Sequence, residues 1–325
     1  MKAIPLDIHF MRQFFSGYLT DHFLYKQYTL YNALKAAQSR IANPRANPLG
    51  RVRTIFRIGK PFSRPRSLKG LDEIDYAAYA KSLRLEIRAT YFQAIETLFE
   101  FIFSLEPREN VIDNRRIWYF LSTSRWRDNN ERIARIAKSD TSFLDREITA
   151  GKMLTVPFIQ YLFYFDVTNP SMLHAVRGSF DPIKKFLVAF AQEFSDRDEY
   201  NAFKHALRIL PAVQNAQIGS YGPTKPIVTL NMSNSMTYLI QERNAISFRT
   251  KPLDTVRDLR MGQACAYLIS NIVLSRRAHF ARNLEVNLHT FSEASFSSAN
   301  DRNVSWKDFK VTMKPGHGDQ AVSAK

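Results

Sequence analysis

Two short stretches of the sequence place a His at helical spacing from an Arg or an Asn. In ARNLEVNLHTF, Arg282 precedes His289 by seven residues, which is two turns along one face of a helix. In RDEYNAFKHALRIL, Asn201 and His205 lie four residues apart and also share a helix face. A His can take up a proton as a general base, and an Arg can stabilise a developing negative charge. Arg282, His289, Asn201 and His205 are therefore the candidate catalytic residues.

These stretches resemble the signature of the HEPN superfamily, in which an Arg, a polar residue and a His are set on a helix with four to six residues between the Arg and the His. Arg282, with Asn283 beside it, and His289 fit this spacing at its upper limit. The stretch that ends at His205 departs from it, because Tyr200 stands where Arg is expected. The resemblance implies an all-helical bundle and a metal-independent ribonuclease of a toxin or defence type that acts across a homodimer interface.

Both histidines also have a purely structural interpretation. His205 lies between Phe203 and Leu207 and can hydrogen-bond a backbone carbonyl at the edge of the core. His289 can lie on the surface at the end of a long helix, with Arg282 among the basic residues that favour a helix C-terminus. The sequence leaves open which interpretation holds, and with it whether the protein is an enzyme.

Other catalytic templates are missing from the sequence. It contains no Gly-rich phosphate loop, no HExxH motif, no nucleophile elbow and no closely spaced set of His and carboxylates, so we expect neither a metal ion nor a cofactor. Asp196, Asp198 and Glu199 are close in sequence but would fan around a helix axis, which indicates a solvent-facing group.

Cysteine usage and hydropathy predict the compartment. Cys265 is the only cysteine, so an internal disulfide is excluded and a reducing intracellular environment is favoured. No signal peptide is evident, and the apolar runs are too short to cross a bilayer. We therefore expect a soluble cytoplasmic protein with no membrane partner.

The charge of the chain is concentrated in one window. The net charge is +16, and no acidic residue stands between Asp21 and Asp72. The second half of this window, residues 44–70, is punctuated by Pro and Gly and predicts an extended arm or long loop around a short strand, RVRTIFRI. Its candidate nucleic-acid-binding residues are Arg51, Arg53, Arg57, Lys60, Arg64, Arg66 and Lys69.

The basic arm has one functional interpretation and two simpler ones. In the predicted strand, alternation puts Arg51, Arg53 and Arg57 on one face, which could lie along a nucleic-acid backbone and release its counterions. The arm could instead be a solvated loop, or it could be neutralised by an acidic face of the same protein or of a partner.

The rest of the chain predicts a mainly α fold, a multi-helix bundle with a small antiparallel β-meander inserted near residues 225–251. Apolar residues recur at helical spacing over 6–42, with a break near Gly17, over 71–107 and over 253–291. Three short β-prone runs between 227 and 251 predict the meander. The expected organisation is an N-terminal segment with the arm over 1–71, a helical core over 72–291 and a polar C-terminal tail over 292–325.

Three functions of different class follow from these features. The leading one is a basic nucleic-acid-binding protein, with RNA favoured over DNA because no recognition helix is evident. The second is the HEPN-like ribonuclease. The third is a non-enzymatic scaffold whose basic arm meets an acidic protein partner.

Overall fold

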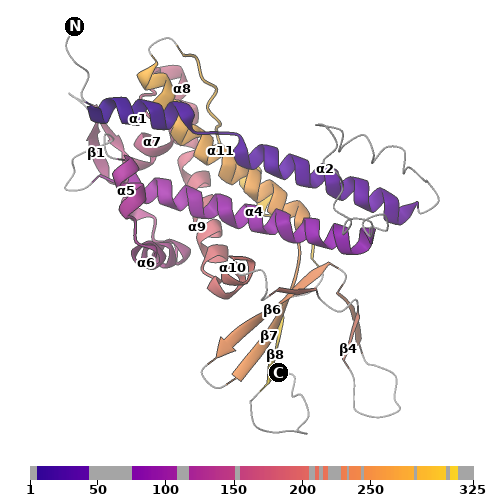
Figure 1. Ribbon diagram of the computed structural model, residues 1–325. Helices are drawn as coiled ribbons and strands as arrows, with labels where there is room; N and C mark the ends of the chain where they lie inside the picture. The colour runs from indigo at the N-terminus through magenta and orange to yellow at the C-terminus, as the bar shows by residue number, and fades with distance from the viewer. Residues whose placement is uncertain are drawn as a thin grey trace, which may run out of the picture.

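In a computed structural model of the chain, three long helices lie side by side (Figure 1). They are α2 (His22–Ala42), α4 (Tyr76–Ser104) and α11 (Thr255–Phe280). Asp75 begins α4 by accepting hydrogen bonds from the backbone N–H groups of Ala77 and Ala78. The structure describes residues 6–43, 75–107, 117–150, 154–204, 209–211, 215–218, 228–232, 234–242, 245–281, 284–304 and 308–313.

The predicted break near Gly17 is confirmed, because α1 (Leu6–Gly17) ends there and α2 begins five residues later. Shorter helices lie around the long ones (Figure 1). They are α5 (Ile117–Thr123), α6 (Trp126–Ala137), η3 (Ser142–Asp145, a 3₁₀ turn), α7 (Phe158–Phe163), α8 (Pro170–Gly178), α9 (Phe180–Phe194), α10 (Arg197–Lys204) and α12 (Glu293–Asn300). A hairpin of β1 (Glu147–Ala150) and β2 (Leu154–Pro157) precedes α7.

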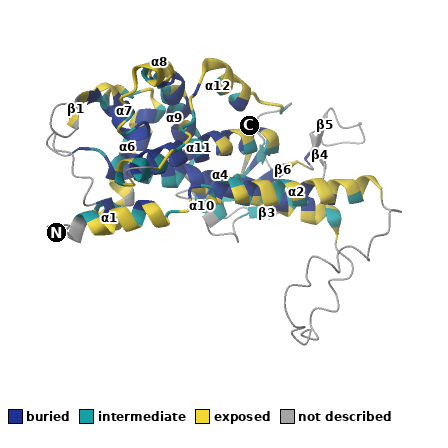
Figure 2. Cartoon of the chain, turned by 90° about the horizontal axis from the view of Figure 1, so that it is seen from above, coloured by how far each residue is buried: buried dark blue, intermediate teal, exposed yellow. Residues whose placement is uncertain are grey.

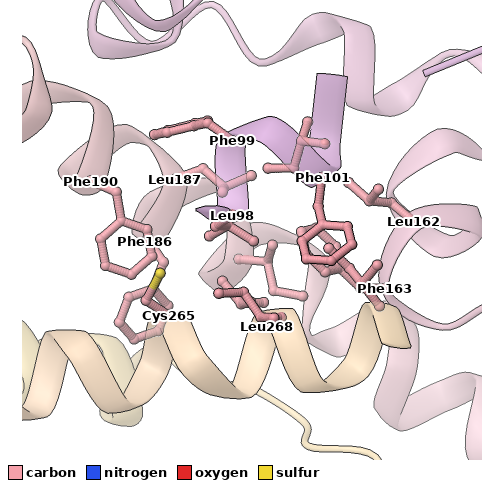
Figure 3. Packing of buried hydrophobic residues seen from close by; sticks show 14 of the residues in the cluster. Leu98, Phe99, Phe101, Leu162, Phe163, Phe186, Leu187, Phe190, Cys265 and Leu268 are labelled. Carbon is pink, nitrogen blue, oxygen red and sulfur yellow. The ribbon is translucent and has the colours of Figure 1, made fainter. Parts of the chain in front are cut away.

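One large apolar core joins these helices. Phe99 and Phe101 of α4, Phe186 of α9 and Cys265 of α11 pack within it, as Figure 3 shows. Phe15 of α1 belongs to the same cluster. The described helices on both sides of residue 71 therefore share one core.

The β-rich region differs from the predicted three-stranded meander. The hairpin of β6 (Ser235–Glu242) and β7 (Ala245–Pro252) is present, but β5 (Val228–Asn231) pairs with β4 (Asn215–Ile218) and not with β6. The neighbours of the hairpin are β3 (Ile209–Pro211) and β8 (Phe309–Met313), in the order β3-β6-β7-β8. Local strand propensity found the strands here, but the tertiary fold chose their partners.

The expectation of one helix over 253–291 is wrong at its C-terminal end. Helix α11 ends at Phe280, and the described residues 284–292 have no regular secondary structure. Side chains of other elements bind the returning backbone. Asn271 binds both the N–H and the carbonyl of His289, and the Phe291 N–H donates to Ser179 Oγ at 3.0 Å. These bonds replace the helical ones that the apolar pattern predicted.

The predicted polar tail over 292–325 contains a helix and a strand in its described part. Helix α12 starts with a capping box, in which the Ser295 N–H donates to Ser292 Oγ and the Ser292 N–H donates to Ser295 Oγ. Strand β8 pairs along its whole length with β7, from Ile246 to Thr250. The tail thus completes the sheet.

Candidate functional site

Most residues that the sequence selected as site residues lie outside the described part of the chain. This holds for the candidate catalytic residues Arg282 and His205 and for the basic residues Arg51, Arg53, Arg57, Lys60, Arg64, Arg66 and Lys69. The other two candidates, His289 and Asn201, are described.

His289 is held mainly by its backbone. Asn271 Nδ2 donates to the His289 carbonyl at 2.7 Å and Asn271 Oδ1 accepts from the His289 N–H at 2.8 Å. Tyr164 Oη donates to the same carbonyl at 2.9 Å. The imidazole stacks on the Tyr267 ring with centroids 3.9 Å apart, and its burial lowers the pKa of His289. Because His289 lies beyond α11, the shared helix face expected for Arg282 and His289 is not formed.

Asn201 lies in a different part of the fold. It belongs to α10, which packs against α4 and β6. The described partners of His289, by contrast, are Tyr164, which follows α7, and residues of α11. Among the described residues, no contact joins the two candidates into one site.

A cluster of buried charges is the most unusual arrangement in the described fold. At its centre, Arg88 Nε donates to Glu199 Oε1 at 2.9 Å. Arg88 Nη1 donates to Glu193 Oε2 at 2.8 Å and to Asp258 Oδ1 at 2.5 Å. The guanidinium carbon also lies 4.7 Å from the centroid of the Phe92 ring. We call this set, with the residues added below, the Arg88 cluster.

Further cations compensate the carboxylates of the Arg88 cluster. Lys251 of β7 donates to Glu199 Oε2 at 2.9 Å and also to Asp196. Arg257 forms an ion pair with Glu193 and donates from Nη2 to Asn300 Oδ1 at 2.6 Å. The cluster thereby ties α4, α9, α10, α11, α12 and β7 together.

The Arg88 cluster corrects the expectation that Asp196, Asp198 and Glu199 face solvent. Asp198 is exposed, but Glu199 is 1% exposed and converges with Asp196 on Lys251. Asp196 precedes α10, and β7 and α4 cover the side of the helix on which Glu199 lies. No local pattern could predict this, since Arg88 lies 111 positions from Glu199 and 170 from Asp258.

The pKa values of two carboxyls in the Arg88 cluster are shifted in opposite directions. Burial raises the pKa of Asp258 to about 7, against the opposing effect of Arg88. Burial also disfavours the charged form of Glu199, but Arg88 and Lys251 outweigh it and hold the pKa of Glu199 below its usual range. The cluster can therefore exchange a proton at Asp258 near neutral pH. Its carboxylates are bound by its own cations, so the cluster holds the helices and β7 together.

The comparisons with known proteins add no relative. Neither a family model nor a curated protein nor a solved structure matches this chain. Within the described ranges, no group of three or more His, Cys, Asp or Glu side chains is placed to hold a metal ion. None of the described helices has the length and apolar character needed to cross a membrane. Any function must therefore be argued from charge and geometry.

Proposed function

We propose that the protein binds nucleic acid, with RNA preferred over DNA, and that the basic segment 44–70 provides the main phosphate contacts. The observation that carries the proposal is the charge distribution. The window between Asp21 and Asp72 contains eleven basic residues and no acid, so it carries most of the net charge of +16. A concentration of positive charge of this kind attracts the phosphate backbone and gains free energy by releasing its counterions.

The carboxylates of the Arg88 cluster bear on one competing interpretation. The simplest competing interpretation is that an acidic face of the same protein neutralises the basic segment. The buried carboxylates Glu199 and Asp258, and the nearly buried Glu193, are instead bound by Arg88, Lys251 and Arg257. These acids are therefore not available to the basic segment.

The preference for RNA rests on shape. The described helices are mutually packed, and the sequence contains no helix-turn-helix signature that would place a recognition helix in the major groove of DNA. RNA is bound more often through loops and single strands, to which a basic segment punctuated by Pro and Gly can adapt. The proposal concerns binding, and cleavage is one outcome of its test.

A salt series with two matched variants tests the proposal. One variant carries Arg51→Gln, Arg53→Gln, Arg57→Gln and Arg64→Gln. The control variant removes the same charge from exposed sites elsewhere, through Arg125→Gln, Arg127→Gln, Lys138→Gln and Arg177→Gln. Binding to labelled single-stranded RNA, single-stranded DNA and duplex DNA is measured by anisotropy across the salt series, with EDTA present.

We expect the segment variant to bind more weakly and with a smaller salt dependence. The slope of log K against log salt should fall by about 0.7 to 0.9 for each phosphate that the variant no longer neutralises, so by about 3 if all four residues contribute. The control variant should keep most of the slope. Equal slopes in the two variants would rule out the basic segment as the binding device. No binding of the wild-type protein would favour an acidic protein partner, and RNA cleavage that survives EDTA would favour the ribonuclease.

A further inference from the structure

Helix α2, which leads directly into the basic segment, has an exposed aromatic face. Tyr25 and Tyr28 are each 69% exposed, although Tyr usually lies at least partly buried in a folded protein. They are three residues apart, so their Cβ atoms lie about 5 to 6 Å from each other on one side of the helix. Figure 2 shows α2 with an exposed side along its length, opposite the buried side that packs on α4 and α11. In the sequence, the basic segment begins two residues after this helix ends.

The charged residues of this helix are all basic. Between His22 and Ala42 there is no acidic residue, while Lys35 is exposed and holds its ammonium 4.3 Å from the centroid of the Tyr31 ring. Lys35 follows Tyr28 by two turns on the same side of the helix. Tyr25, Tyr28 and Lys35 thus lie on one side of a helix that contains no acidic residue, and Glu86 of the neighbouring α4 is paired with Lys26 at 2.8 Å.

A hollow borders the first of these rings. It has a volume of about 680 Å³, and Tyr25, His22, Lys26 and Arg277 are among its lining residues. A smaller hollow of about 260 Å³ adjoins it, shares Ser16 and Arg277 with it, and is also lined by Arg12 and Phe280. Asp21 is the one acidic residue among the described residues that line the two hollows. The larger volume lies in the range that accepts a small organic group such as a nucleotide base.

We propose that this face, formed by Tyr25, Tyr28 and Lys35 with the adjoining hollow, is a stacking platform for single-stranded nucleic acid. Successive bases lie on the two rings and in the hollow, while the backbone passes Lys35 toward the basic segment. The inference rests on the proposed function and names its substrate class. Bases of a duplex are stacked on each other and unavailable to these rings, so the platform selects single strands.

Charge continuity favours this occupant over a protein partner or a second copy of the chain. Exposed tyrosines are also common in protein interfaces. Here, however, the rings stand on an acid-free helix that continues into a segment with several Arg and Lys and no acid. Rings interleaved with cations are the arrangement that binds an unpaired strand without sequence preference. A second copy of this positively charged face would repel the first.

The test compares the removal of the rings with the removal of their hydroxyls. The full-length protein is prepared with Tyr25→Ala and Tyr28→Ala, and separately with Tyr25→Phe and Tyr28→Phe, and Tyr119→Ala of α5 serves as a control for an exposed ring elsewhere. Affinity is measured for a single-stranded oligonucleotide, for the same strand with abasic positions and for a duplex. Far-ultraviolet circular dichroism and thermal unfolding check that each variant is folded, and sedimentation gives the oligomeric state.

We expect the double Ala variant to bind the single strand at least about tenfold more weakly, because each base stacked on an aromatic ring contributes on that order. Its duplex affinity should be unchanged, and the double Phe and Tyr119→Ala variants should bind as the wild type does. The abasic strand should bind the wild type as weakly as the intact strand binds the double Ala variant.

Two further outcomes separate the failure of the platform from the failure of the proposed function. Wild-type binding that the double Ala variant fully retains would overturn the platform and leave the proposed function standing. Absence of wild-type binding to every probe would overturn both. A double Ala variant that changes only its oligomeric state would assign this face to contacts between copies and overturn the platform.

Discussion

Arg88 of α4 and Asp258 of α11 lie 2.5 Å apart, from Nη1 to Oδ1, and thereby connect two of the three central helices through a buried ion pair. Both side chains are nearly inaccessible, at 13% and 2% exposed. Two ions removed from water need good geometry and additional partners to compensate for their missing hydration. Arg88 is also bound by Glu193 and Glu199, and Lys251 in turn binds Glu199. The stability of this fold therefore depends on how many protons the Arg88 cluster holds.

The Asp258→Asn variant should change the pH dependence of stability. An Asp in an unfolded chain loses its proton near pH 4, whereas the pKa of Asp258 in the folded protein is about 7. Between these values the folded state binds the extra proton, so the contribution of Asp258 to stability is lost as the pH rises. The unfolding free energy of the variant minus that of the wild type should therefore increase by up to about 1.4 kcal/mol per pH unit from about pH 4 to about pH 7. Urea unfolding across this range measures it, and a constant difference would contradict it.

The Glu199→Gln variant should show the opposite trend. The pKa of Glu199 is lowered in the folded protein, so its carboxylate stabilises the fold at neutral pH and this contribution is lost as the pH falls through that pKa. Removing the charge leaves Arg88 and Lys251 with fewer counterions. In urea unfolding we expect a destabilisation of about 3 kcal/mol at neutral pH, the lower end of the range for breaking a buried ion pair. The effect should shrink on acidification, and Asp198→Asn on the exposed side of α10 is the control.

Arg276 should be required for stability although no carboxylate is among its described hydrogen-bond partners. Its Nη1 donates to the Leu162 carbonyl at 2.9 Å and its Nη2 to the Tyr161 carbonyl at 3.2 Å, both in the last turn of α7, where backbone carbonyls lack helical partners. Arg276→Met leaves these carbonyls buried and unsatisfied, which should cost at least about 3 kcal/mol. Arg260→Met, an exposed change on the same helix, should stay within about 0.5 kcal/mol in thermal or urea unfolding.

Gly262 should be required for the close approach of α2 to α11. A Cβ at this position would overlap the buried Gln27 Nε2, whereas one at Gly17 would meet no atom within 4 Å. Gly262→Ala should therefore destabilise the protein by about 1 kcal/mol despite the better helix propensity of Ala, and Gly17→Ala should not. Adding Gln27→Ala should remove much of the clash, so that the two changes are not additive. Additive effects in urea unfolding would contradict this packing.

Asn271→Ala should destabilise the protein more than His289→Ala does. Asn271→Ala removes the side chain that binds both the N–H and the carbonyl of His289 and should cost about 2 to 3 kcal/mol, because buried donors and acceptors are left unsatisfied. His289→Ala keeps that backbone bound and removes only the stacking on Tyr267, so about 1 kcal/mol is expected in thermal unfolding. A larger effect of His289→Ala would show that the ring and not the backbone is the structural element. Loss of RNA cleavage without loss of stability would support a catalytic His289.

Local pattern was sufficient for the long helices. The apolar repeat and the Asp75 cap fix α4, and the break at Gly17 separates α1 from α2. The same pattern failed beyond Phe280, because Asn271 and Ser179 bind the returning backbone with side chains that are distant in sequence. The prediction of strand pairing failed for the same reason, since one partner of β7 is β8, at residues 309–313.

The sequence by itself determined the charge distribution, because net charge and its concentration between Asp21 and Asp72 depend on composition alone. It also determined where the aromatic residues of α2 stand along the chain. Only the tertiary structure decided which of them are exposed, since packing on α4 and α11 buries Phe23 and leaves Tyr25 and Tyr28 outside. The tertiary structure also created the Arg88 cluster, since it brings charged residues together from distant segments of the chain. The pKa values of Glu199 and Asp258 depend on this burial and on these neighbouring charges.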